Sequence, residues 1–435
     1  MPFVPQRSTI NQTLQFGLET TPGTGVPANK KLQCFDVILG AMADVNTYTP
    51  TGRKYPAIVI ENSEWVEGTM SGILDYNGAV YALSGVCGAA TSIAAHGASA
   101  VAKDWTFNPP LSGSVQPQTY TIEQGENNSF GNAIWNHKVA YGLFSELGYK
   151  IDRKAGATVS GKLLAQQLQT AITMTATPTA IAIQPSAGKH FNVYLDTTFA
   201  AIGTTLIALE DLSLDFAFTN IYSPYFPLNR ANLGFAAHVD TKPSAILKML
   251  LQADPVGMAP LAYLQAGQTV FCQVNGQGLV IDNNQTLTFG GGVTSGNFTL
   301  SYKGQTTANI AYTTGLTAAT VNTAFQLLST VGTNCTVSGP AGGPYVFAFS
   351  GLLANDTTAM TATNVSLLGG TPTIVVTQTQ VYAGFKHNMA LKVSKPNPFQ
   401  DSNGVFATEW DFTVVEDAAS GLAQQFVLTN LLTAL

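Results

Sequence analysis

The feature of this sequence that most constrains its fold is an alternation of apolar and polar residues with a period of two. The segments 139–152, 207–219 and 405–417 all show it, and Gly, Pro and Asn bound such segments along the chain. This period predicts β-strands with one apolar and one polar face, which belong to antiparallel sheets with one side in water. We therefore predict a mainly β chain, an antiparallel sandwich or barrel with few helices and no evident internal repeat.

Two segments carry helical signals. In 243–252, Pro243 would occupy the favourable first turn of a helix, which makes this segment the best helix candidate in the larger part of the chain. In 317–329, Val321, Ala324, Phe325 and Leu328 form one apolar stripe. Thr317 precedes that stripe at a position suited to an N-cap.

The texture of the chain changes between about residues 284 and 380. This part is rich in Thr, Gly and Asn, and it contains short strands around the helix predicted at 317–329. Strands of the earlier style resume after it. We therefore predict a β-domain formed by residues 1–283 and 381–435, interrupted by an inserted small α+β module at 284–380. Its size, about 95 residues, lies within the usual range for a domain.

Charged residues are scarce: 10% of the 435 residues are charged, and the formal net charge is −6. Roughly 25% is usual for a soluble domain. A surface with so few charges is typical of a protein that buries much of its surface against other subunits. The negative balance argues against a nucleic-acid grip, which needs Lys and Arg to displace counterions from phosphates.

The segment 67–90 raises a separate question, because the chain has no charged residue between Asp75 and Lys103. A membrane anchor, a buried core helix and an assembly loop are the physical candidates. Polar and glycine interruptions between 79 and 102 argue against a spanning helix, which needs about 20 apolar residues. We expect Gly72 to Gly88 to contact neighbouring subunits, and a buried core within one domain is the alternative. The expected anchors of the contact are Leu74, Tyr76, Val80, Tyr81 and Leu83.

Motifs for catalysis or metal binding have little support. Residues 156–163, GATVSGKL, match a phosphate-binding loop up to its lysine, but Leu163 follows where Ser or Thr should bind magnesium. The same residues alternate as in a strand. The five histidines and four cysteines are scattered without the spacing of a metal site or nucleophile. We therefore expect no enzyme activity, no cofactor and no metal.

Three stretches together resemble the major tail tube proteins of long-tailed, siphovirus-type bacteriophages. They are LETTPGTGVPANKKLQ at 18–33, SGILDYNGAVYALSGVCG at 71–88 and QPQTYTIEQGE at 116–126, the last preceded by DWTFNPP. The likeness covers roughly residues 10–283 and 381–435. The segment 296–351 separately resembles a module found inserted in phage structural proteins, although the tail tube pattern usually runs without so large an insert.

The resemblance implies a β-sandwich subunit that forms hexameric rings, which stack into the tube of a phage tail. Genomic DNA would leave the virion through the lumen without specific binding, and no membrane would be involved. Partners would be further copies of the chain and other tail proteins, namely the tape measure, terminator and distal tail proteins. The polar strand faces give the candidates for the lumen lining: Glu146, Lys150, Asp152, Asp211, Ser213 and Asp215.

A virion-surface or extracellular binding protein of β-modules, such as an adhesin, is the alternative. The N-terminal residues show neither a basic start leading into an apolar run nor a small-residue cleavage site, so secretion is not expected. Long tubes or discrete particles in an electron micrograph would separate the two hypotheses.

Overall fold

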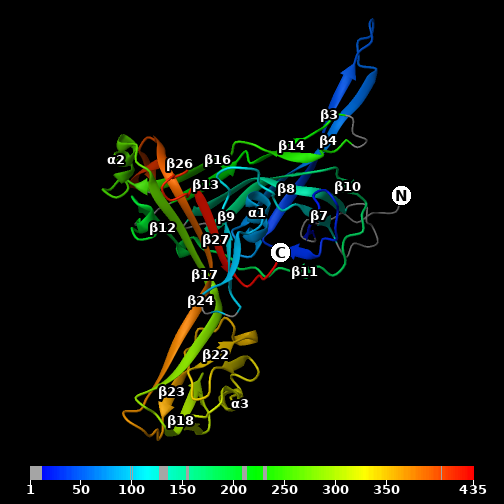
Figure 1. The fold of residues 1–435 in the computed structure, drawn as a ribbon. Helices are drawn as coiled ribbons and strands as arrows, with labels where there is room; N and C mark the ends of the chain where they lie inside the picture. Colours follow the sequence, from blue (N-terminus) through cyan, green and yellow to red (C-terminus); the bar gives the residue numbers. More distant parts are fainter. Residues whose placement is uncertain are drawn as a thin grey trace.

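The strands of the alternating segments lie in one sheet and turn their apolar faces toward one core. The computed structural model describes residues 12–97, 99, 101–126, 136–152, 156–207, 213–228, 233–402 and 404–435. Within them the chain is mainly β with three short α-helices, as the period-two pattern predicted (Figure 1).

Eight strands form the main sheet, and all their neighbouring pairs are antiparallel. In spatial order the sheet runs β3–β4–β9–β8–β13–β16–β26–β24. The bounds of these strands are β3 Phe35–Tyr48, β4 Ile58–Ile73, β9 Gly156–Ala165, β8 His137–Asp152, β13 Ser213–Thr219, β16 Ser244–Gln252, β26 Val405–Val414 and β24 Thr373–Pro396.

Further strands continue from β8 and β24 behind the main sheet. On one side β8 pairs with β7, which pairs with β1; on the other, β24 pairs with β17, which pairs with β12. Strand β27 joins β24 to β6. The bounds are β1 Thr13–Leu18, β7 Tyr120–Gly125, β12 Phe191–Asp196, β17 Val270–Gly290, β6 Lys103–Phe107 and β27 Gln424–Asn430, with helices α1 Gly78–Cys87 and α2 Ala259–Ala266.

An aromatic cluster around a buried histidine joins the two ends of this core. Tyr149 of β8 stacks on Phe216 of β13, with ring centroids 5.1 Å apart. The imidazole of His387 in β24 packs 3.8 Å from the ring of Phe426, and its Nδ1 lies 2.9 Å from the Tyr149 hydroxyl. Burial lowers the pKa of His387 to about 3.

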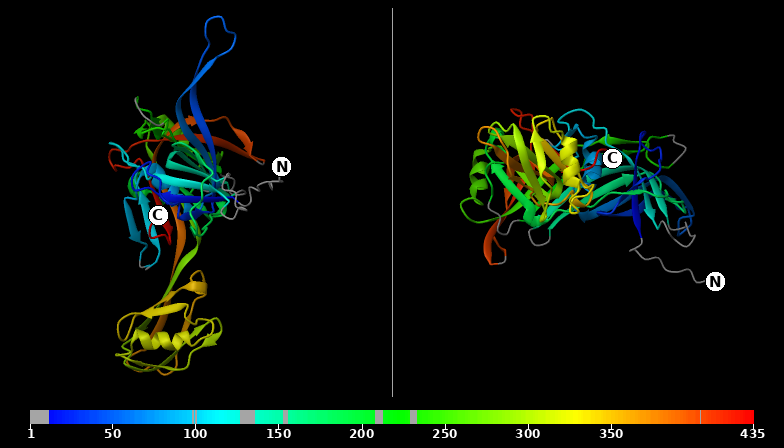
Figure 2. Two further views of the ribbon diagram at one scale, coloured as in Figure 1. Left: turned by 90° about the vertical axis from the view of Figure 1, so that its right-hand side faces the viewer. Right: turned by 90° about the horizontal axis from the view of Figure 1, so that it is seen from below.

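The segment predicted as an insert has a core of its own. Its buried side chains, which run from Leu287 to Leu367, form a cluster separate from the core of the body. A ribbon made of β17 and β24 leads from the body to this module (Figures 1 and 2). The elements of the module are β18 Ser295–Tyr302, β20 Ile310–Thr313, α3 Ala318–Gln326, β21 Cys335–Ser338, β22 Tyr345–Phe349 and β23 Thr361–Asn364.

Helix α3 begins as the sequence predicted. The Thr317 hydroxyl accepts a hydrogen bond of 3.3 Å from the backbone N–H of Thr320. Val321 and Phe325 bury the apolar stripe in the module core. The module has two charged residues, Lys303 and Asp356, and they form an ion pair with each other. Burial raises the pKa of Asp356, but the hydrogen bonds from Lys303 and Thr358 outweigh it and lower that pKa to about 2.

The helix predicted at 243–252 is wrong, because this segment forms strand β16. Ala245, Leu247, Met249 and Leu251 are buried while the residues between them are not, which is a period of two. The strand is central in the sheet, with β13 on one side and β26 on the other. Pairing on both sides outweighs the helical propensity of its Ala, Leu, Lys and Met residues.

His387 predicts a loss of stability in mild acid. An unfolded histidine titrates near pH 6.5, whereas the folded protein keeps this one neutral down to about pH 3. Between these values the unfolded chain binds the extra proton, so the free energy of unfolding falls as pH is lowered, by up to about 1.4 kcal/mol per pH unit. In urea titrations from pH 7 to 4.5, His387→Gln should reduce this fall relative to the parent. Equal slopes in the two proteins would contradict the expectation.

The ribbon predicts a clean excision of the module. Asn284 and Thr379 lie directly opposite each other on β17 and β24, so an Asn-Gly turn replacing residues 285–378 should close a hairpin there. We expect the shortened chain to keep the circular dichroism of a β protein. It should also unfold in one cooperative thermal transition, within a few degrees of the temperature at which the body unfolds in the full-length protein. Aggregation or loss of this transition would mean that the module is needed to fold the body.

Candidate functional site: the polar face of the main sheet

The face of the main sheet turned away from the core carries charges of alternating sign. Lys150 lies opposite Asp215, Asp215 opposite Lys248, Lys248 opposite Asp411, and Asp411 opposite Lys395. These five residues form one row across β8, β13, β16, β26 and β24. Opposite charges directly across neighbouring strands stabilise a sheet by roughly 0.2–1 kcal/mol per pair. The row therefore reinforces the order of the strands as well as giving the face its polarity.

The structure brings five of the six predicted lining residues onto this face. Glu146 accepts a 2.9 Å ion pair from Lys162 on the neighbouring strand, and this contact raises the pKa of Lys162. Asp211 lies outside the described residues. The five that share the face are Glu146, Lys150, Asp152, Ser213 and Asp215.

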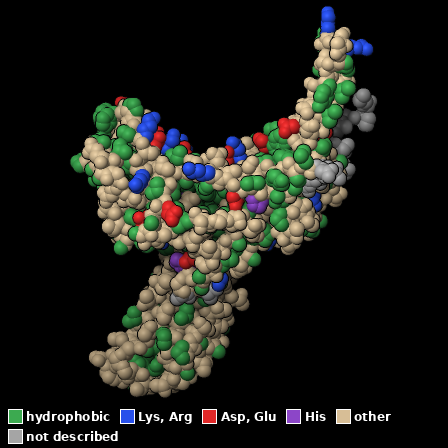
Figure 3. All heavy atoms as spheres, turned by 45° about the horizontal axis from the view of Figure 1, so that its top comes forward, with side chains coloured by type: hydrophobic (Ala, Val, Ile, Leu, Met, Phe, Trp, Pro, Cys, Tyr) green, Lys and Arg blue, Asp and Glu red, His purple; other side chains and the backbone are tan. Residues whose placement is uncertain are grey.

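Figure 3 shows this face as a hollow between the β3–β4 hairpin and the end of the body that carries α2. Lys and acidic side chains are scattered along it, with apolar side chains between them. Among the described residues of the row, neighbouring lysines and carboxylates compensate each other, which weakens the attraction of this face for phosphates.

The lining residues predicted from the sequence do not include Lys248, Asp411 and Lys395, which complete the row. The helix predicted at 243–252 includes Lys248, so this prediction offers no reason to place the lysine on the polar face of a strand. The alternation of buried residues in β16 was the signal that could have placed it. Asp411 lies in the alternating segment 405–417, but no local pattern indicates its partners Lys248 and Lys395 on the neighbouring strands. The Asn397 amide also donates to Asp411 at 3.1 Å.

The predicted subunit anchors do not lie on a surface, and this prediction is corrected. Leu74, Tyr76, Val80, Tyr81 and Leu83 are at most 2% exposed within one chain. All of α1 is buried by segments of the same chain. Gln118 N donates to Ser84 O, and the Tyr120 and Tyr222 hydroxyls donate to Tyr81 O and Val86 O. These side chains have no surface left for another subunit, so the uncharged segment forms an intradomain core.

The segment 18–33, one of those that carry the resemblance, is fixed by a buried carboxylate. Glu19 accepts hydrogen bonds from the hydroxyls of Thr119 and Thr121 and from the backbone of Gly23 and Tyr141, at 2.8–3.0 Å. These hydrogen bonds satisfy both carboxylate oxygens, which gives Glu19 a structural role.

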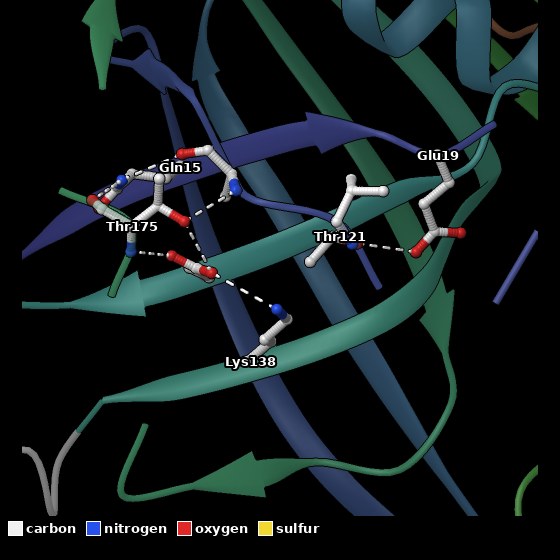
Figure 4. Close-up of polar contacts among 8 residues, drawn as sticks. Gln15, Glu19, Thr121, Lys138 and Thr175 are labelled. Carbon is white, nitrogen blue, oxygen red and sulfur yellow. Dashed lines mark hydrogen bonds and ion pairs between the residues drawn. The ribbon is translucent and has the colours of Figure 1, made fainter. Parts of the chain in front are cut away.

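A second buried carboxylate lies nearby, and Figure 4 shows the polar contacts of this region. Glu123 accepts from the backbone and hydroxyl of Thr175 at 2.6 and 3.1 Å, and its Oε1 lies 3.7 Å from Lys138 Nζ. Gln15 donates to the carbonyl of Thr175 at 2.9 Å. The network ties the loop at 174–176 to β1, β7 and β8.

The residues considered for catalysis do not come together. The phosphate-loop-like residues 156–163 lie in strand β9. Within the described part of the chain, no group of three or more His, Cys, Asp or Glu residues could hold a metal. Among the same residues, no helix has the length and apolar character needed to cross a membrane.

Comparisons with known proteins give little. No protein-family model matches the chain, and no curated protein matches it. Among solved structures, a chain from Mycobacterium phage Patience is similar at 18% identity, over 32% of this chain and 49% of that one, with a TM-score of 0.18. Since the match spans less than half of that phage chain at so low a TM-score, it gives no basis for assigning fold or function.

The two faces of β13 predict opposite responses to substitution. Asp215→Lys should lower the free energy of unfolding by about 1 kcal/mol or less, because it places three lysines in a row on a wet surface. Phe216→Ala, one residue further, should lower it by about 3–5 kcal/mol, because the ring is buried. Urea unfolding of both variants checks the assignment, and a larger loss for Asp215→Lys would reverse it.

Proposed function

We propose that this protein is the major tail tube subunit of a siphovirus-type bacteriophage, a structural virion protein whose copies form stacked rings. The observation that supports it most is the main sheet, which is wide, has one wet face of mixed charge and ends in two strand edges. Sheets of this kind from several subunits can join edge to edge into a barrel around water. Such closure also removes edges that would otherwise aggregate.

The shape of the body supports the same reading. The polar face is the hollowed side, and the module projects from the opposite side of the body (Figures 1 and 3). If the hollow faces the channel, the module decorates the outside of the tube. A lining of mixed, partly compensated charge would let DNA pass without holding its phosphates.

The partners of this proposal are other copies of the chain and other tail proteins, with DNA passing through the lumen. The chemistry of the face needs neither a cofactor nor a metal. The localisation that follows is the tail of the virion, after synthesis in the host cytoplasm.

Electron microscopy of the purified protein tests the proposal. We expect hollow rings or tubes, and we expect the variant with residues 285–378 replaced by Asn-Gly to form tubes of the same bore but smaller outer diameter. Discrete particles at all concentrations and salts would favour the surface-binding alternative. Tubes whose bore changes on excision would place the module inside the wall or lumen.

A further inference from the structure

We infer that the body contains two copies of one structural unit, and that molecules join by repeating between chains the contact that joins the two units within a chain. A ring of six units then contains three molecules. The edge-to-edge contact is argued from the structure alone. The number three rests on the proposed function, because the resemblance to tail tube proteins implies a ring of six units.

The two units have the same elements in the same chain order. The first unit consists of β1, β3, β4, α1, β7, β8 and β9, and the second of β12, β13, β16, α2, β17, β24 and β26. In the first, strand pairs run β3–β4–β9–β8–β7–β1. In the second they run β13–β16–β26–β24–β17–β12, again all antiparallel. The helices also correspond, because α1 packs near β8 and α2 near β24.

The registers agree at the level of single residues. Each unit has one bulge in the pair formed by its last two strands, between Phe144 and Glu146 in one and between Val393 and Lys395 in the other. Aligning these bulges also places Met70 on Met249, through the separate pairings of β4 with β9 and β16 with β26. Both methionines are buried. Bulges at matching places in two units are a shared design feature, because a bulge sets the local bend of a strand.

Within the chain, the second unit contacts the first in two ways. Strand β13 adds to the edge of β8 over six residue pairs. In addition a hairpin, the second arm (residues 221–228 and 233–240, with strands β14 Tyr222–Tyr225 and β15 Ala237–Asp240), lies back over the first unit. In this arm Phe226 packs on Trp65 at 5.8 Å and Phe235 on Tyr141 at 4.9 Å.

The equivalent groups at the two ends of the molecule have no such partners among the described residues. The first arm, residues 43–60 at the far end of the β3–β4 hairpin, is exposed throughout and projects from the body (Figures 1 and 2). It carries Tyr48, Ile58 and Ile60 on one face, each about half exposed. A hairpin standing alone in water is marginally stable, and an exposed apolar surface of this kind marks a contact site.

The surface of the second unit that would receive an arm is also uncovered. Helix α1 is wholly buried, partly by Tyr222 of the second arm, whereas its counterpart α2 has Pro260 as its one buried residue and leaves Leu261 exposed. The first arm of a second molecule would cover α2 as the second arm covers α1. The occupant that the structure specifies is therefore another copy of this chain.

The sheet edges fit this arrangement. Leu391 is the last residue of β24 that pairs with β17. Beyond it, the open edge of the main sheet follows the end of β24 and then β25 (Gln400–Ser402), both of which pair with β26 on their other side. By the register above, Ile38 of β3 corresponds to Asp215, and Gln400 to Lys150, so Ile38 should lie opposite Gln400 of the next molecule. Asn397 donates to Glu409 of β26, so Pro396 and Pro398 face the open edge. Prolines limit indiscriminate pairing there, which gives the arm a larger share of the contact.

A pair of cysteines tests the contact directly. Residues opposite each other in adjacent strands have Cβ atoms about 4.5–5.5 Å apart, close to the separation in a disulfide. The full-length double variant Ile38→Cys, Gln400→Cys is allowed to assemble and is then oxidised with oxidised glutathione. On a non-reducing gel we expect covalent dimers and then a closed trimer as the largest species. The single variants and the pair Ile38→Cys, Leu352→Cys, which uses an exposed module position, should give neither series.

Each outcome has a consequence. A series that ends at six chains would overturn the count of three, and the absence of cross-links in assembled material would overturn the edge contact. Tubes without cross-links would contradict the edge contact and leave the proposed function intact. Closed cross-linked rings that never stack into tubes would contradict the proposed function and leave the edge contact intact. As a second measurement, Ile58→Asp with Ile60→Asp should give a folded monomer by light scattering, and the charge-matched Leu327→Asp with Leu352→Asp in the module should still assemble. Normal assembly of the arm variant would remove the arm from the contact.

Discussion

The pairing of β8 with β13 is the interaction on which the rest of the body depends. It turns two four-stranded sheets into one sheet of eight, and it brings Tyr149 against Phe216 on the inner face. That contact in turn encloses His387 and Phe426, so the strands behind the sheet share one core with those in front. A sheet with one wet face is stable when its other face is covered, because burial of apolar side chains supplies most of the stabilisation.

The few charged residues of the chain are unevenly distributed between the module and the body. The module contributes two charges that pair with each other, and the row from Lys150 to Lys395 places charged residues of alternating sign on the hollow face. The two regions therefore present different surfaces, one almost uncharged and one polar and balanced. Under the proposed function these would be the outer decoration and the channel wall of a tube.

The two units of the body differ in whether their arm and helix have partners within the chain. The second arm finds its place on the first unit through Trp65 and Tyr141, and it completes the cover of α1. The first arm and α2 repeat those elements without the matching half. A unit that offers one surface and needs its complement forms a head-to-tail contact, and such contacts generate closed rings or filaments.

The sequence by itself determined the local features of this protein. Alternation predicted the strands and the mainly β class, and Thr317 with the stripe at Val321 and Phe325 predicted α3, because caps and periodicity act within a few residues. The second core also spans the segment whose composition marked it as an insert. Only the tertiary structure decided what depends on distant partners. The strong helix formers of 243–252 became a strand because β13 and β26 pair on both sides of them. The anchors expected between 72 and 88 became core because segments more than 30 residues away cover α1. The row of charges, the duplicated unit and its open edges likewise arise from pairings between strands far apart in the chain, and no local pattern specifies which strands will meet.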